Sequence, residues 1–60
     1  MKTWKFEVNN NYIIVKYYEA FNEYSVSVRT KSGYEAEFKT YKNKSAVNRY
    51  LKSWGLDERI

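Results

Sequence analysis

The sequence contains neither cysteine nor histidine, and these two absences exclude most of the chemistry that small proteins carry out. Histidine and cysteine provide most general bases, nucleophiles and zinc ligands. Without cysteine, the chain also lacks the disulfides that stabilise many small domains. The sequence therefore predicts a protein that is not an enzyme, has no metal site and no cofactor, and resides in the cytoplasm.

Proline is absent as well, and glycine occurs only at Gly33 and Gly55, so the chain has no glycine-rich loop for phosphate. Long apolar runs are also missing. The longest, Tyr12–Val15, is far too short to span a bilayer. The first ten residues lack the apolar stretch of a signal peptide. No membrane partner is expected from these features.

Acidic residues are few, and their pattern does not predict a catalytic carboxyl pair. Glu35 and Glu37 are expected on one face of a strand, beside Lys39. Catalytic carboxyl groups need a pocket that separates their pKa values, whereas an open strand face leaves both groups in water. We interpret them as ordinary surface charges.

Aromatic residues are abundant, with two Trp, seven Tyr and three Phe among 60 residues. A chain of this length forms one domain, here residues 1–60, and buries only about 60% of the surface that its unfolded form exposes. Each buried aromatic ring removes about 150–250 Å² from water, so a few rings are enough for a workable core.

Three segments, about residues 3–8, 24–31 and 34–41, show the alternation of apolar and polar residues that is typical of half-buried strands. A further segment, about residues 12–18, is rich in β-branched and aromatic residues, which also predicts a strand. Short connections between successive strands favour an antiparallel meander. Phe21, in the connection between the second and third strands, has no assigned place in this arrangement.

The apolar period then changes from two to about 3.6, which predicts one amphipathic helix. Its apolar residues lie three or four positions apart: Val47, Tyr50, Leu51 and Trp54. We expect the helix over about residues 46–54, with Ser45 as N-cap and Asn43 as the competing candidate. Gly55 is placed to end the helix in the left-handed conformation, and residues 57–60 are expected to form a frayed tail.

The helix must bury its apolar side against one face of the sheet. The predicted fold is therefore α+β, a small two-layer ββββα domain in which the other sheet face stays open. The residues assigned to the face under the helix are Trp4, Phe6, Val8, Ile13, Val15, Val26, Val28, Ala36 and Phe38.

Basic residues are concentrated in the second half of the chain. Residues 1–28 carry equal numbers of acidic and basic side chains, whereas residues 29–52 carry seven basic and two acidic ones. We predict a small non-enzymatic nucleic-acid-binding module that contacts phosphates through Arg29, Lys31, Lys39, Lys42, Lys44, Arg49 and Lys52. Such contacts confer affinity without sequence specificity. A charged helix face and a net charge of +4 are also ordinary in a soluble small protein.

The open sheet face supports an alternative. Its predicted stacking or interface residues are Tyr12, Ile14, Tyr18 and Tyr41. Aromatic rings beside basic residues are a platform for bases, at about 1–3 kcal/mol per base. The same residues also suit a protein interface, because exposed apolar area does not by itself identify the kind of partner that binds it. The alternative is a protein–protein interaction module, such as a phage or mobile-element inhibitor or accessory protein, with a homodimer as one form.

The segment Phe38–Leu51, FKTYKNKSAVNRYL, leads from a strand through a basic turn into an amphipathic helix. In this layout it resembles the small sheet-plus-helix DNA-binding domains at the start of phage-type integrases, whose sheet enters the major groove. The expected four strands, rather than three, depart from that pattern. In strand count the chain is also similar to four-strand-plus-helix single-strand DNA binders. The resemblance identifies no family, and a shared fold is not evidence of activity. Of the nucleic acids, we expect DNA rather than RNA as the ligand.

Overall fold

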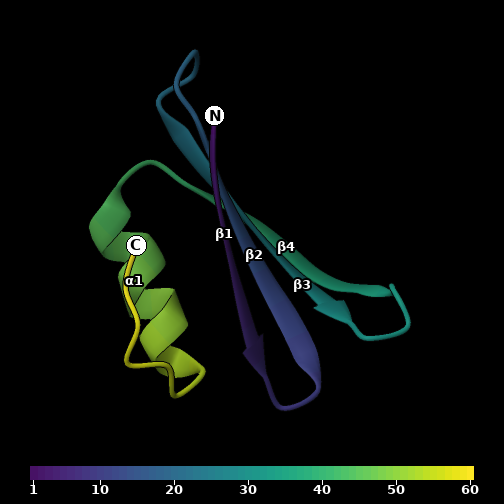
Figure 1. Cartoon of the computed structure of the whole chain (residues 1–60). Helices are drawn as coiled ribbons and strands as arrows, with labels where there is room; N and C mark the ends of the chain where they lie inside the picture. The colour runs from purple at the N-terminus through teal and green to yellow at the C-terminus, as the bar shows by residue number, and fades with distance from the viewer.

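The computed structural model describes all 60 residues and confirms the α+β fold with its ββββα order. The elements are β1 (Lys2–Val8), β2 (Asn11–Tyr18), β3 (Glu23–Thr30), β4 (Glu35–Tyr41) and α1 (Lys44–Ser53). The strands pair antiparallel in the order β1-β2-β3-β4, so β1 and β4 are the two edges of one sheet (Figure 1). Each strand begins and ends within one residue of its predicted boundary.

Asparagine makes the turns on either side of β2. Asn9 and Asn10 have φ values of 48° and 63°, which form the two-residue turn between β1 and β2. Asn22, at φ 50°, ends the turn between β2 and β3. Asparagine tolerates this left-handed region better than most residues, and its short side chain makes local hydrogen bonds. Phe21, which had no predicted place, lies in the second of these turns with 73% of its surface exposed.

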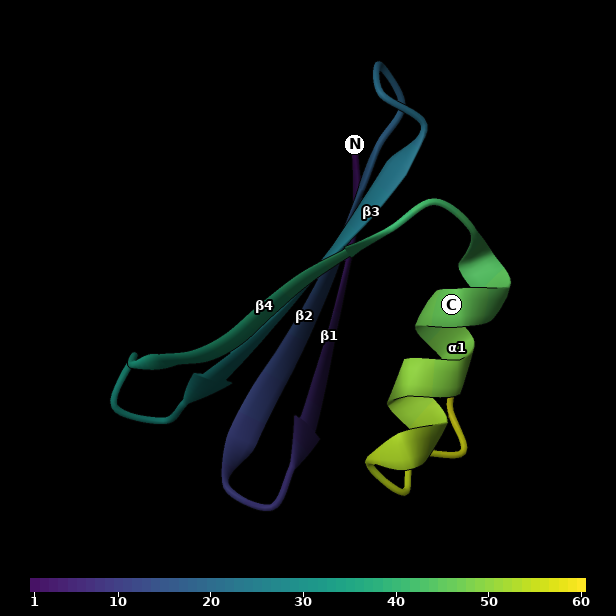
Figure 2. The same ribbon diagram turned by 180° about the vertical axis from the view of Figure 1, so that it is seen from behind.

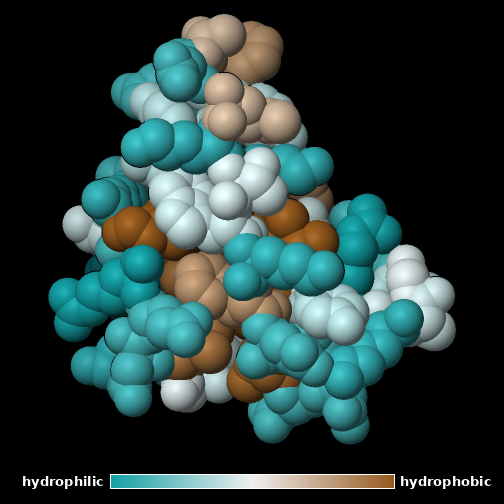
Figure 3. Space-filling model, in the orientation of Figure 1, coloured by the Kyte–Doolittle hydropathy of each residue, from teal (hydrophilic) through white to brown (hydrophobic).

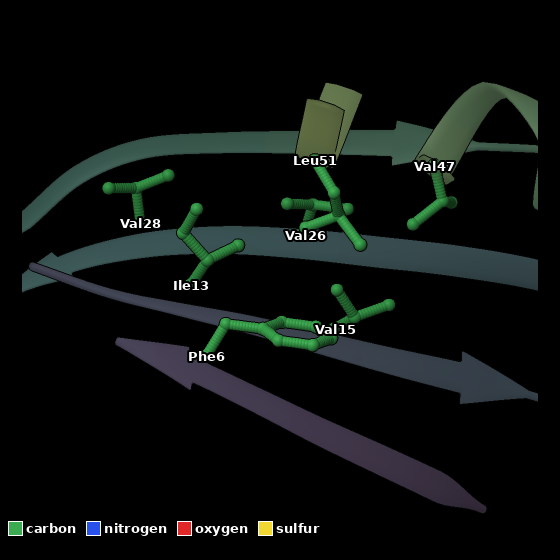
Figure 4. Packing of buried hydrophobic residues seen from close by; sticks show 7 residues of the cluster. All are labelled: Phe6, Ile13, Val15, Val26, Val28, Val47 and Leu51. Atoms are coloured by element: carbon green, nitrogen blue, oxygen red, sulfur yellow. The ribbon is translucent and has the colours of Figure 1, made fainter. Parts of the chain in front are cut away.

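The core lies between the sheet and α1. Figure 3 shows only small apolar areas on the surface in that view, separated by hydrophilic side chains. In the interior, Val47 and Leu51 extend from α1 toward the sheet (Figure 4). They meet five buried side chains of the first three strands: Phe6, Ile13, Val15, Val26 and Val28. Five aromatic residues that are only partly buried pack around this centre: Trp4, Tyr24, Tyr41, Tyr50 and Trp54.

The ends of α1 are set by Asn43 and Gly55. The Asn43 Oδ1 accepts a hydrogen bond from the backbone N–H of Ala46 at 2.9 Å, so Asn43 is the N-cap and the prediction of Ser45 was wrong. At the other end, the N–H of Gly55 donates to Lys52 and that of Leu56 donates to Leu51. With Gly55 at φ 82°, this is the predicted Schellman motif. At ten residues, α1 is too short to cross a membrane.

Asn43→Ala is expected to lower the free energy of unfolding by about 1 kcal/mol, because the N–H of Ala46 loses its acceptor. In a domain of this size, that loss lowers Tm by about 4–8 °C. Thermal unfolding followed by circular dichroism measures the change. Ser45→Ala is the matched control and should leave Tm nearly unchanged. If Ser45→Ala lowered Tm more than Asn43→Ala, Ser45 would be the N-cap, as expected from the sequence.

The segment after α1 is not a frayed tail. Leu56 and Ile60 are half-buried and pack against the core, and the Ile60 N–H donates to Asn48 Oδ1 at 2.9 Å. The segment turns and runs back along α1, as both ribbon views show (Figures 1 and 2). The polar run Asp57–Arg59 suggested fraying, but it only spaces two apolar residues that reach the core.

The face of β4 that lies toward α1 is the opposite of the one predicted. Tyr41 pairs with Tyr24 and packs on Tyr50 of α1, with ring centroids 6.1 Å apart. Successive side chains of a strand point to opposite faces, so Tyr41 on the helix side puts Phe38 on the other. Tyr41 directly precedes the connection to α1, which holds it near the helix. Phe38 is consequently 56% exposed, and the prediction that it lies in the core was wrong.

A bulge near the start of β4 places Glu35 and Glu37 on opposite faces of the sheet. Val28 pairs with Glu37 whereas Arg29 pairs with Glu35, so Ala36 is an extra residue in the ladder. Glu37 therefore lies on the helix side, where it accepts a hydrogen bond from the Tyr50 hydroxyl. Glu35 shares the opposite face with Arg29. The predicted common face for Glu35 and Glu37 was wrong because alternation cannot anticipate a bulge.

Candidate functional site

The candidate site is the face of the sheet that α1 does not cover, called the open face below. The register arranges its residues in rows that cross the strands from β1 to β4. One row contains Lys5, Ile14, Ser27 and Phe38; the next contains Thr3, Lys16, Ser25 and Thr40; another contains Glu7, Tyr12, Arg29 and Glu35. Tyr18 and Glu23 lie opposite each other at one end of the face.

The aromatic and apolar residues of the open face come from β2 and β4. Tyr12, Ile14 and Tyr18 lie on this face, as the alternation of β2 predicted, and all three are half-buried. Tyr41 does not join them because it lies on the helix side. Phe38 takes its place and is more exposed than any of the three. The sequence did carry a signal for Phe38, since Phe38 and Tyr41 cannot share one face of a regular strand.

Each carboxylate of the open face lies in an ion pair. Glu7 pairs with Lys31 at 2.7 Å, Glu35 with Arg29 at 3.5 Å, and Glu23 with Lys42 at 3.2 Å. Two lysines of the face have no such partner. Lys5 places its ammonium 4.3 Å from the centre of the Tyr12 ring, and Lys16 has no carboxylate within ion-pair distance. The uncompensated charge of this face is therefore positive.

The Glu7–Lys31 pair shifts the pKa values of both groups. The hydrogen bond and the charge of Lys31 lower the pKa of Glu7, and Lys5 lowers it slightly further. The same hydrogen bond and the negative charge of Glu7 raise the pKa of Lys31. The pair therefore stabilises the fold at pH values above the ordinary pKa of Glu7, and this contribution is lost as pH falls through its lowered value. At the alkaline end, it is lost as pH rises through the raised pKa of Lys31.

Lys31→Ala is expected to raise the pKa of Glu7 toward its ordinary value of 4.5, because the carboxylate loses its main cationic neighbour. An NMR titration that follows the side-chain carboxyl carbon of Glu7 measures this change. Lys16→Ala removes the same charge elsewhere on the open face and should leave the Glu7 titration in place. Equal shifts in both variants would mean that net charge, and not this ion pair, sets the pKa.

The seven basic residues predicted as one phosphate-binding surface lie in three separate places. Arg29, Lys31 and Lys42 are at the rim of the open face, each in an ion pair. Lys39 is on the helix side, 5.5 Å from the centre of the Tyr50 ring. The remaining three, Lys44, Arg49 and Lys52, are exposed on α1. Proximity in the sequence did not bring them together, because a strand sends alternate side chains to opposite faces.

Arg49 and Lys52 line a surface hollow of about 360 Å³ between α1 and the segment that follows it. The other lining residues are Ser45, Asn48, Leu56, Asp57, Glu58 and Arg59. Two carboxylates therefore lie among three basic side chains, and the local charge is mixed. The hollow offers much less net attraction to a phosphate than the sequence of α1 suggests.

Tyr50, Glu37, Tyr41 and Lys39 form a polar cluster at the edge where α1 meets β4. Burial, followed by the hydrogen bond to Glu37, raises the pKa of Tyr50 to about 12. The hydroxyl therefore stays protonated and donates to the carboxylate throughout the neutral range. This cluster attaches α1 to the edge strand and positions the sheet whose other face is the candidate site.

Comparison with protein-family models, curated proteins and solved structures finds no significant match to this chain.

Proposed function

We propose that this chain is a non-enzymatic module that binds nucleic acid, with DNA as the first ligand to test, across its open face. The observation that carries the proposal is the charge arrangement of that face. All three of its carboxylates are paired, whereas Lys5 and Lys16 have no carboxylate partner. A polyanion that approaches this face meets uncompensated positive charge beside aromatic rings.

Lys5 and Lys16 are suited to phosphates by their relative position. Lys5 lies opposite Ile14, and Lys16 is two residues further along β2 on the same face. Such diagonal neighbours have Cα atoms about 7–8 Å apart. Their long side chains adjust to successive phosphates of one strand. Arg29, Lys31 and Lys42 surround the same face, but a phosphate must compete there with a carboxylate, so we assign the primary contacts to Lys5 and Lys16.

The second candidate is a protein partner on the same face. It is favoured by Ile14 and Phe38, which offer apolar surface that a phosphate backbone does not use. Buried aromatic and aliphatic anchors of this kind dominate the energetics of protein interfaces. A protein partner predicts weak dependence on salt, whereas nucleic-acid binding predicts a steep one.

The test is fluorescence anisotropy of labelled oligonucleotides, titrated with protein at low and near-physiological salt. Lys5→Glu/Lys16→Glu should weaken binding by about tenfold or more and reduce the log–log salt slope by about 1.4–1.8, since each phosphate contact contributes about 0.7–0.9. Arg49→Glu/Lys52→Glu changes the net charge equally and should have a much smaller effect. If the α1 variant is the more damaging one, the site lies on the helix; if wild type does not bind at low salt, the proposal fails.

A further inference from the structure

Ile14, Ser27 and Phe38 are direct neighbours in one row of the open face, on β2, β3 and β4. The small Ser27 therefore lies between two larger apolar side chains. Phe38 is 56% exposed, although phenylalanine is among the residue types that are most often buried. Ser27 is half-buried, and its hydroxyl makes no hydrogen bond to another protein group.

The spacing in this row suits one flat ring. Directly opposed residues of antiparallel strands have Cα atoms about 4.5 or 5.5 Å apart, so Ile14 and Phe38 are about 10 Å apart across Ser27. Side chains in a sheet stand roughly perpendicular to it. A planar ring with carbon contacts of about 3.5–4 Å on both sides needs about 7–8 Å between its neighbours. One ring therefore fits above Ser27, and two stacked rings do not.

We propose that the open face binds single-stranded nucleic acid by taking one unpaired base between Ile14 and Phe38, above Ser27. This inference rests on the proposed function and adds the class of nucleic acid to it. The Ser27 hydroxyl can donate to or accept from the edge of the base. Lys5 lies at the β1 end of the same row, and Lys16 is two residues from Ile14 on β2, so both unpaired lysines lie on the Ile14 side of the base, within reach of the adjoining phosphates of the strand.

A duplex cannot use this arrangement. Its bases are paired and stacked on each other, so their flat faces are not available to Phe38, and only its phosphates reach Lys5 and Lys16. A single strand offers both its phosphates and the flat faces of its bases, since the bases can turn out and stack on side chains. The open face should therefore prefer single strands over duplexes, and strands with bases over strands without them.

The test uses the full chain and three labelled ligands of about 10 nucleotides: a thymine single strand, its duplex, and a strand of equal charge with abasic positions. The base-bearing strand should bind most tightly. Phe38→Ala should weaken its binding about 5- to 150-fold, the range that corresponds to 1–3 kcal/mol for one stacked base. The same substitution should leave the abasic strand and the duplex nearly unchanged. Ser27→Leu, which fills the space between Ile14 and Phe38, should have the same effect as Phe38→Ala.

Phe21→Ala is the matched control, because it removes a phenylalanine that is even more exposed than Phe38 and lies in the turn between β2 and β3. It should not change the affinity for any of the three ligands. Equal affinity for base-bearing and abasic strands, with no effect of Phe38→Ala, would overturn the base site; if Lys5→Glu/Lys16→Glu still weakened that binding, the proposed function would survive. Failure of all three ligands to bind would overturn both the base site and the proposed function. An aromatic side chain of a protein partner would then be the ligand to test between Ile14 and Phe38.

Discussion

Leu51→Ala is expected to lower the free energy of unfolding by about 2–5 kcal/mol. Leu51 is fully buried and extends from α1 into the aliphatic centre of the core, beside Val26 and Ile13 (Figure 4). Removing its side chain loses apolar contact and leaves a cavity. A chain of 60 residues has a total stability of about 3–9 kcal/mol, so this one substitution removes a large part of it.

Urea denaturation followed by tryptophan fluorescence and circular dichroism measures the loss. The matched control is Lys52→Ala, one residue further along α1 and exposed, which should stay within about 0.5 kcal/mol of wild type. A loss below about 1 kcal/mol for Leu51→Ala would mean that α1 does not pack on the sheet as described. It would also imply that the face under α1 is as accessible as the open face.

Leu56→Ser/Ile60→Ser is expected to cost about 2–3 kcal/mol, the second largest effect. Both side chains are half-buried against the core, and full burial of one such side chain contributes about 1.5–3 kcal/mol. The hydrogen bond from the Ile60 N–H to the side-chain Oδ1 of Asn48 should be lost together with these contacts. The returning segment is thus part of the folded domain and not an appendage.

Asp57→Ser/Glu58→Ser is the matched control in the same segment, because both residues are exposed and make no ion pair. It should leave the urea midpoint nearly unchanged. Hydrogen exchange supplies a second measurement, since the Ile60 amide should be protected in wild type and in the control variant but not in Leu56→Ser/Ile60→Ser. If Leu56→Ser/Ile60→Ser caused only a small loss of stability and the Ile60 amide of wild type were unprotected, residues 57–60 would form a frayed tail, as the sequence predicted.

The two faces of the sheet have different roles. Substitutions under α1 change stability, whereas Phe38→Ala, Ser27→Leu and charge reversal at Lys5 and Lys16 should change binding with little effect on folding. The separation follows from the period of two, because residues that alternate along one strand serve the core and the open face in turn. Thermal unfolding of each binding variant therefore distinguishes a lost contact from a lost fold.

The pattern of amino acids was sufficient to assign the elements and their order. Alternation in β1 and β3 was strong enough to assign Phe6 and Val26 to the core, because only one face of each of these strands is clearly apolar. Ile13 was also assigned correctly, although β2 carries apolar or aromatic residues on both faces. The period of 3.6 after residue 41 was equally clear and located Leu51. Gly55 was predictable because few other residues tolerate the left-handed conformation that ends a helix.

Contacts in the folded chain establish which face of β4 lies against α1, where the terminal segment lies, and which charged side chains have no ion-pair partner. β4 carries aromatic residues on both faces, so its own pattern is ambiguous, and the packing of Tyr41 on Tyr50 selects one face and exposes Phe38. The ion pair between Glu7 and Lys31 joins residues far apart in the chain. Periodicity is a local property, whereas facing, pairing and charge compensation depend on contacts between distant segments. For this reason the place of Phe38 on the open face and the unpaired state of Lys5 and Lys16 could be recognised only in the folded chain.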